Sequence, residues 1–84
     1  MPKLNWEIIL WNLTEAREQI EQIEELAKSK KKPSEVEFQI KLAHAYHHLN
    51  FAWNIRHAST KSYSNLSEDD FNKWGKYPTD IEEL

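Results

Sequence analysis

Two histidines, His44 and His48, stand four residues apart in the segment His-Ala-Tyr-His-His. On a helix this spacing places both imidazoles on one face, where they can share a metal ion. His47 lies three residues from His44 and could replace His48 as the second ligand. The helix of a zinc protease carries glutamate directly after its first histidine, but Ala45 stands there. A complete metal site would need carboxylates from elsewhere, or the same pair from a second copy.

A structural role is the alternative for these histidines. Isolated histidine pairs commonly occur without a metal, so the sequence favours His44 and His47 as hydrogen-bonded residues of an interior or an interface, with His48 in solvent. A divalent metal held by His44 and His48 at a subunit interface is kept as the second hypothesis. We predict no other cofactor.

Arg56 lies one turn past an apolar stripe, and a buried guanidinium needs a carboxylate partner. We expect a structural ion pair, for which Glu7, Asp69 and Asp70 are the candidates. The alternative is a ligand-binding bundle that uses Arg56 and the tryptophans. Catalysis has little support, because the serines near His57 fall in a loop with no evident orienting group. We therefore predict no catalytic residues and no enzyme.

The histidines belong to a segment that predicts a long helix over about residues 35–59. Its apolar residues form two stripes, each repeating with helical spacing. The first stripe consists of Phe38, Leu42, Ala45, Tyr46, Leu49, Ala52 and Trp53. The second consists of Val36, Ile40, Ala43, Phe51, Ile55 and Ala58, together with His44 and His47. A helix that is apolar on two sides must be covered twice.

A second long helix is predicted over about residues 5–29, with Asn5 as its N-cap. Its apolar seam follows a heptad, with steps of three and four residues. The seam consists of Trp6, Ile9, Leu13, Ala16, Ile20, Ile23 and Ala27. A short lysine-rich connection then leads to Ser34 and Glu37, whose spacing is that of a capping box. The short loop makes the two helices antiparallel neighbours, which pair the seam with the first stripe.

The last third of the chain predicts smaller elements. Ser59 to Asn65 is polar and is expected to be a loop. Ser67 begins a weaker capping pattern, and Gly75 stands where the helix over about residues 68–74 would end. The tail over residues 76–84 includes a possible last turn that carries Ile81 and Leu84.

Composition limits the class of protein. The chain has 84 residues, a net charge of −3, one glycine and no cysteine. These values favour a single domain, disfavour nucleic acid as a partner, and rule out glycine-rich phosphate loops and thiolate metal sites. No apolar run approaches the roughly 20 residues of a membrane span, and no signal peptide is evident. We expect a cytoplasmic protein that neither crosses nor binds a membrane.

The sequence as a whole predicts an all-α fold: an antiparallel hairpin with a short C-terminal helix, associated with a second copy as a homodimeric four-helix bundle. The predicted interface residues are Trp11, Ile40, His47, Phe51 and Ile55. The helix over about residues 5–29 cannot cover both stripes of its neighbour, so a second copy of the chain is expected to cover the second stripe. Surplus apolar and aromatic surface favours a non-enzymatic interaction, adaptor or regulatory module, with an unidentified protein as a further possible partner.

Overall fold

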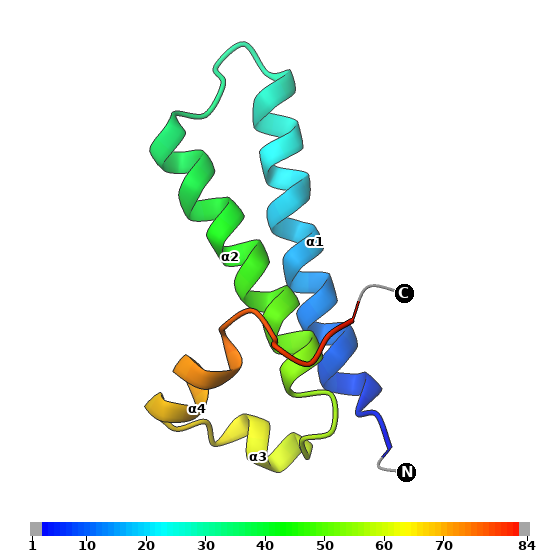
Figure 1. Ribbon diagram of the computed structural model, residues 1–84. Coiled ribbons are helices and arrows are strands. Elements are labelled where there is room, and N and C mark those ends of the chain that lie inside the picture. The colour runs from blue at the N-terminus through cyan, green and yellow to red at the C-terminus, as the bar shows by residue number, and fades with distance from the viewer. Residues whose placement is uncertain (1–2, 83–84) are drawn as a thin grey trace.

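A computed structural model describes residues 3–82, and these residues form helices and no strand (Figure 1). The helices are α1 (Trp6–Lys28), α2 (Glu35–Asn54), α3 (Thr60–Ser64) and α4 (Glu68–Trp74). The predicted antiparallel hairpin is confirmed: α1 and α2 pack against each other and diverge toward their connecting loop. Helices α3 and α4 lie at the opposite end, and the segment after α4 crosses back over the hairpin.

The capping signals in the sequence fix three helix boundaries. Ser34 accepts a hydrogen bond from the backbone N–H of Glu37, and the Glu37 side chain accepts one from the Ser34 N–H. Ser67 caps α4 in the same way by accepting from the N–H of Asp70, and Gly75 ends that helix. Helix α1 begins after Asn5 as predicted, but the Asn5 side chain does not cap it.

Helix α2 ends at Asn54, about one turn earlier than the sequence indicates. Tertiary hydrogen bonds explain the difference, because Asn5 donates its backbone N–H to the carbonyl of Arg56 and its amide to the carbonyl of Ala58. The predicted loop after residue 59 is also wrong in part. Ser59 accepts from the N–H of Ser62 and thereby caps the five-residue helix α3.

The contact between α1 and α2 is rotated relative to the predicted seam. Asn12 is fully buried at this contact, whereas its neighbour Leu13 is 40% exposed. The other buried residues of the two helices are Ile8, Ile9 and Ala16 from α1, and Ala45, His48, Phe51 and Ala52 from α2. The small residues Ala16 and Ala45 are both 1% exposed, which fits a close approach of the helices at mid-length.

The apolar core lies between the hairpin and the C-terminal third of the chain. Ile8, Phe51 and Ile55 form its buried centre, and they pack against Ala58, Tyr63, Leu66 and Trp74. The core is small for a chain of this length. Among the described residues, seven hydrophobic side chains are buried, whereas fourteen large ones are at least 40% exposed. In this part of the chain, no helix has the length and apolar character needed to cross a membrane.

Candidate functional site

The histidines of α2 form a cluster around the one polar pair buried between the long helices. His48 is buried, and its Nδ1 lies 2.8 Å from Oδ1 of Asn12. Its Nε2 lies 3.0 Å from Nε2 of His44, which is exposed. Trp11 packs edge-on against the His48 ring at a centroid distance of 5.7 Å. The cluster therefore runs from the contact between the helices out to the surface.

The protonation of each ring nitrogen follows from Asn12. The Asn12 amide nitrogen donates to the carbonyl of Ile8 at 2.9 Å, which leaves Oδ1 as the acceptor facing His48. His48 must therefore carry its proton on Nδ1, and its Nε2 presents a lone pair. The Nε2 of His44 donates to that lone pair. The Tyr63 hydroxyl, at 3.4 Å, is a second donor toward Oδ1 of Asn12.

The environment disfavours the charged form of two of these imidazoles. Burial lowers the pKa of His48 below its usual value, and the nearby His44 and His47 lower it further. Burial also lowers the pKa of His47, with His44 as the second cause. A neutral imidazole with a free lone pair is the form that accepts a proton or binds a metal.

The structure corrects the predicted roles of the histidines. His48, expected in solvent, is the most buried of the three, because the rotation of the hairpin turns it toward Asn12. His47 is half-buried between Phe51 and Phe71, with ring centroids 4.5 and 4.6 Å away. Residues 3–82 bring no three His, Cys, Asp or Glu side chains together as a metal-binding group. The pair His44 and His48 thus stands without a third protein ligand of these types.

The predicted interface is also corrected in part. Phe51 and Ile55 are 2% and 0% exposed because α3, α4 and their flanking residues already cover them, so a second copy cannot reach them. His47 is covered by Phe71 of α4. Trp11 and Ile40 remain 51% and 64% exposed, so the chain itself does not cover these two predicted interface residues. The second stripe of α2 is therefore covered from within the chain only in its C-terminal half, at Phe51 and Ile55, whereas Val36 and Ile40 stay exposed.

Arg56 pairs with Asp80, which lies later in the tail than the candidates Asp69 and Asp70. Its Nη2 lies 3.1 Å from a carboxylate oxygen of Asp80, and its Nη1 donates to the carbonyl of Trp53. The guanidinium also stacks 3.9 Å above the Trp53 ring. The indole N–H of Trp53 and the Arg56 guanidinium together hold the pKa of Asp80 below its usual value. Arg56 therefore binds the tail to the hairpin.

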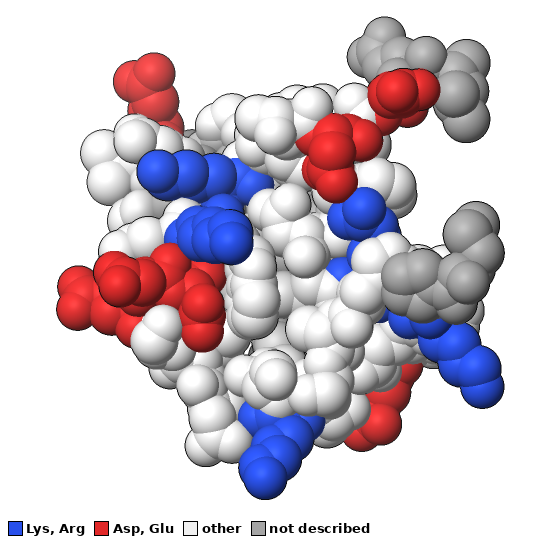
Figure 2. Space-filling model, turned by 60° about the horizontal axis from the view of Figure 1, so that its bottom comes forward, with Lys and Arg blue, Asp and Glu red and all other residues white. Residues whose placement is uncertain are grey.

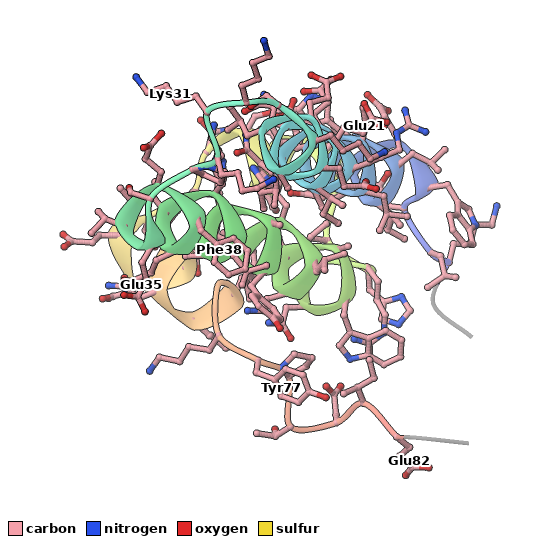
Figure 3. All side chains as sticks on the ribbon, turned by 90° about the horizontal axis from the view of Figure 1, so that it is seen from above. Glu21, Lys31, Glu35, Phe38, Tyr77 and Glu82 are labelled. Atoms are coloured by element: carbon pink, nitrogen blue, oxygen red, sulfur yellow. The ribbon has the colours of Figure 1, made fainter. Side chains whose placement is uncertain are left out.

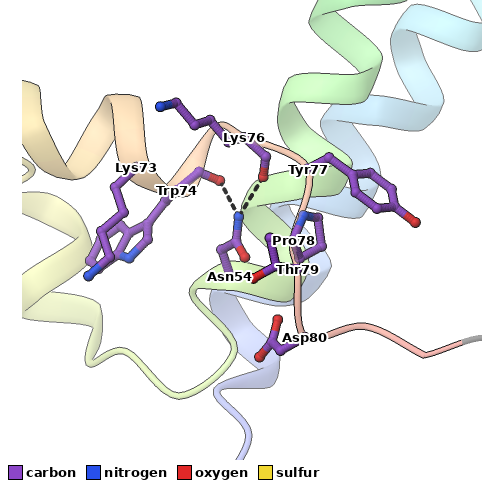
Figure 4. Close-up of a pocket in the computed structure, with 8 residues that line it drawn as sticks. All are labelled: Asn54, Lys73, Trp74, Lys76, Tyr77, Pro78, Thr79 and Asp80. Atoms are coloured by element: carbon purple, nitrogen blue, oxygen red, sulfur yellow. Dashed lines mark hydrogen bonds between the residues drawn. The ribbon is translucent and has the colours of Figure 1, made fainter.

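Asn54 provides a second attachment for the same segment. Its amide nitrogen donates to the carbonyls of Trp74 and Lys76, each at 2.8 Å (Figure 4). Pro78, which follows Tyr77, is buried. In the view from the loop end, Tyr77 and Glu82 lie on the side of α2 that faces away from α1 (Figure 3). The tail is thus held against the hairpin by Arg56 and Asn54 as far as the described residues extend.

One side of the hairpin is left open. A groove of about 250 Å³ runs between α1 and α2, with walls that include Trp6, Leu13, Leu49 and Trp53. Ile20 lies one heptad beyond Leu13, and Phe38 lies eleven residues before Leu49, so both continue the same sides of their helices. We call this surface the open apolar face; its six members are 40–56% exposed. They are Leu4, Trp6, Leu13, Ile20, Phe38 and Leu49.

The open apolar face combines residues of the predicted seam and of the first predicted stripe. Trp6, Leu13 and Ile20 belong to the heptad seam, and Phe38 and Leu49 belong to the first stripe of α2. These two sets were predicted to pair with each other. The two helices are rotated relative to the predicted pairing and diverge toward their connecting loop. The two sets therefore lie beside each other, and their side chains stay half-exposed. A signal for this was present: each set contains more apolar residues than one helix pair can bury.

Charged groups are scarce in the groove that forms one end of the open apolar face. Arg56 is the one charged residue that lines the groove, and Asp80 already pairs with it. At the α3 and α4 end, Lys, Arg, Asp and Glu side chains lie around the rim and leave an uncharged middle (Figure 2). Comparisons with protein-family models, curated proteins and solved structures gave no match.

Proposed function

We propose that this protein is a small non-enzymatic interaction module that self-associates, and that the open apolar face is where the second copy binds. The single observation that carries the proposal is the set of half-exposed apolar side chains on one side of both long helices. In such a dimer, the α1 and α2 helices of the two copies form a four-helix bundle. A cytoplasmic location and an adaptor or regulatory role are part of the same proposal.

The size of the face supports a stable dimer. Six side chains of this size and exposure leave on the order of 500 Å² of apolar surface. A standard interface buries about 800 Å² on each partner, and in homodimers about 65% of it is apolar. A standard homodimer interface therefore needs about 500 Å² of apolar surface on each copy, which is about the area that the open apolar face presents.

The charge pattern also favours a second copy as the occupant. A two-fold interface places the same patch of both subunits in contact, so a face with charge of one sign would repel itself. The groove end of the face avoids this repulsion, because the cation that lines it, Arg56, is neutralised within the chain by Asp80. The small core gives a further reason: burying the face adds the apolar area that a chain without disulfides needs.

The position of the contact differs from that predicted by the sequence. Phe51 and Ile55, the largest buried members of the histidine-bearing stripe, are covered by the chain's own C-terminal third, so the second copy is assigned to the other side of the hairpin. His44 and Leu49 are separated by about 140° around α2, at about 100° per residue. The bundle contact and the histidine pair are therefore separate features.

Sedimentation equilibrium over a range of concentrations tests the proposal. We expect the natural chain to be a dimer and Leu49→Glu to be a monomer, because the substitution places two unpaired carboxylates in the contact. Leu49 is exposed enough for the variant to fold, which circular dichroism checks. Ile40→Glu is the matched control: it changes an exposed apolar residue of the same helix outside the face, and should remain dimeric.

Two results would overturn the assignment. A natural chain that is monomeric at every concentration removes the dimer altogether. Dissociation by Ile40→Glu with Leu49→Glu still dimeric moves the contact to the opposite side of α2.

A further inference from the structure

The geometry of His44 and His48 carries an inference that is independent of self-association. The two Nε2 atoms lie 3.0 Å apart, and both rings come from one side of α2. Metal–nitrogen bonds of ~2.0–2.1 Å separate neighbouring nitrogen ligands by about 2.9 Å at an angle of about 90°, and by about 3.3 Å at the tetrahedral angle. The observed separation is close to the right-angle value, which is typical of tetragonal Cu²⁺ and Ni²⁺.

We propose that His44 and His48 form a two-histidine site for a divalent transition metal, bound through both Nε2 atoms, with Cu²⁺ and Ni²⁺ preferred over Zn²⁺. The remaining positions are filled by water. The site belongs to a single chain and lies away from the open apolar face, in contrast to a metal shared between subunits.

Asn12 acts as the positioning residue of this site. By accepting the Nδ1 proton of His48 at 2.8 Å, it fixes both the ring orientation and the tautomer that exposes the Nε2 lone pair. Asn12 is itself held by its hydrogen bond to the Ile8 carbonyl. Hydrogen-bond partners that do not touch the metal orient the metal-binding imidazoles in known metal sites. His44 has only to move its proton from Nε2 to its other nitrogen, and its exposure lets water mediate that transfer.

The surroundings leave room for the metal and its water ligands. A shallow surface depression of about 460 Å³ lies against the pair and is lined by Ala43, His44, His47, His48 and Phe71. The open surface beside the pair permits a metal to bind without displacing a buried side chain, once His44 has moved its Nε2 proton.

Titration of the chelator-treated protein with CuCl₂ or NiCl₂, followed by calorimetry, tests the site. We expect one metal per chain, weaker binding of ZnCl₂, and at least about a tenfold loss of affinity in His44→Ala, because one of the two ligands is gone. His44 is exposed, so this variant should fold. His57→Ala is the matched control, since His57 is exposed and bonds only to the Lys3 carbonyl; its affinity should be unchanged.

A second measurement addresses Asn12. In Asn12→Ala we expect the affinity for Cu²⁺ to fall about 10–100-fold, as when hydrogen-bond partners of other metal ligands are replaced. The electron paramagnetic resonance signal of two bound nitrogens should also weaken. Equal affinity of natural and His44→Ala chains would overturn the proposal. So would an equal loss in His57→Ala, which would indicate general surface binding by histidine.

Discussion

His48 donates its Nδ1 proton to Oδ1 of Asn12 across 2.8 Å, at the centre of the contact between α1 and α2. Both residues are buried, and the chain satisfies both: the Asn12 amide bonds to Ile8 and the other His48 nitrogen faces His44. No buried side-chain nitrogen or oxygen of residues 3–82 lacks a partner. A polar pair at this depth fixes the rotation of one helix against the other, because any other rotation would leave the pair unsatisfied.

The first prediction concerns this pair. Asn12→Leu should lower the free energy of unfolding by about 1–3 kcal/mol, because the buried His48 N–H loses its acceptor. The double variant Asn12→Leu/His48→Leu should recover part of that loss, since both polar groups are then gone. Urea unfolding of the single and double variants measures the coupling. Strictly additive losses would mean that the hydrogen bond contributes nothing specific.

The second prediction concerns pH. The folded protein lowers the pKa of His47 and His48, so the unfolded chain takes up protons first as the pH falls. Stability should therefore be constant above the ordinary histidine pKa of 6.5 and decrease as the pH falls below it. The groups that face these rings are His44, Asn12, Trp11, Tyr63, Phe51 and Phe71, none of which is a carboxylate that could stabilise an imidazolium.

Urea unfolding at pH 7.5 and at about pH 5.5, with a chelator present, checks this dependence. His57→Ala should keep it, because His57 is exposed and lies beyond the C-terminal end of α2. His47→Phe should reduce it by removing one of the two titrating rings. A stability that rises on acidification would contradict the direction of both pKa shifts.

The third prediction concerns the tail. Asn54→Ala removes two hydrogen bonds that hold the segment after α4, so the population with a released tail should rise about tenfold. Limited trypsin digestion, with mass spectrometry of the fragment that begins at Tyr77, should show correspondingly faster cleavage after Lys76. Asn72→Ala changes an exposed asparagine of α4 and serves as the control. Equal cleavage rates in both variants would show that Asn54 does not hold the tail.

Much of the fold could be predicted from local signals. The capping box at Ser34 and the cap at Ser67 depend on residues three positions apart, and the heptad spacing of α1 identifies a long helix with an apolar side. Such features are set by short-range chemistry, and the structure confirms them. The end of α2 could not be found in this way, because it depends on hydrogen bonds from Asn5, more than fifty residues away in sequence.

The candidate site was less predictable for a related reason. Helical spacing indicated that His44 and His48 share a face, but the burial of each depends on how α1 and α2 are rotated. The polar residue Asn12 lies at the centre of the contact, and an apolar pattern assigns that place to Leu13. The covering of Phe51 and Ile55 by the C-terminal third was equally hidden, since that segment carries only scattered apolar residues.

The fourth prediction concerns Gly75, where α4 meets α2. A Cβ added at this position would lie 2.8 Å from Cε1 of His47 and 3.0 Å from the carbonyl oxygen of Phe71, although the backbone there has an ordinary helical conformation. The restriction is therefore one of space, and Gly75→Ala should cost about 1–3 kcal/mol in unfolding free energy. The same Gly75→Ala change should cost less when it is made in His47→Ala, because the imidazole is then absent. Urea unfolding of the three variants measures this, and an unchanged cost would assign the conflict to the Phe71 carbonyl instead.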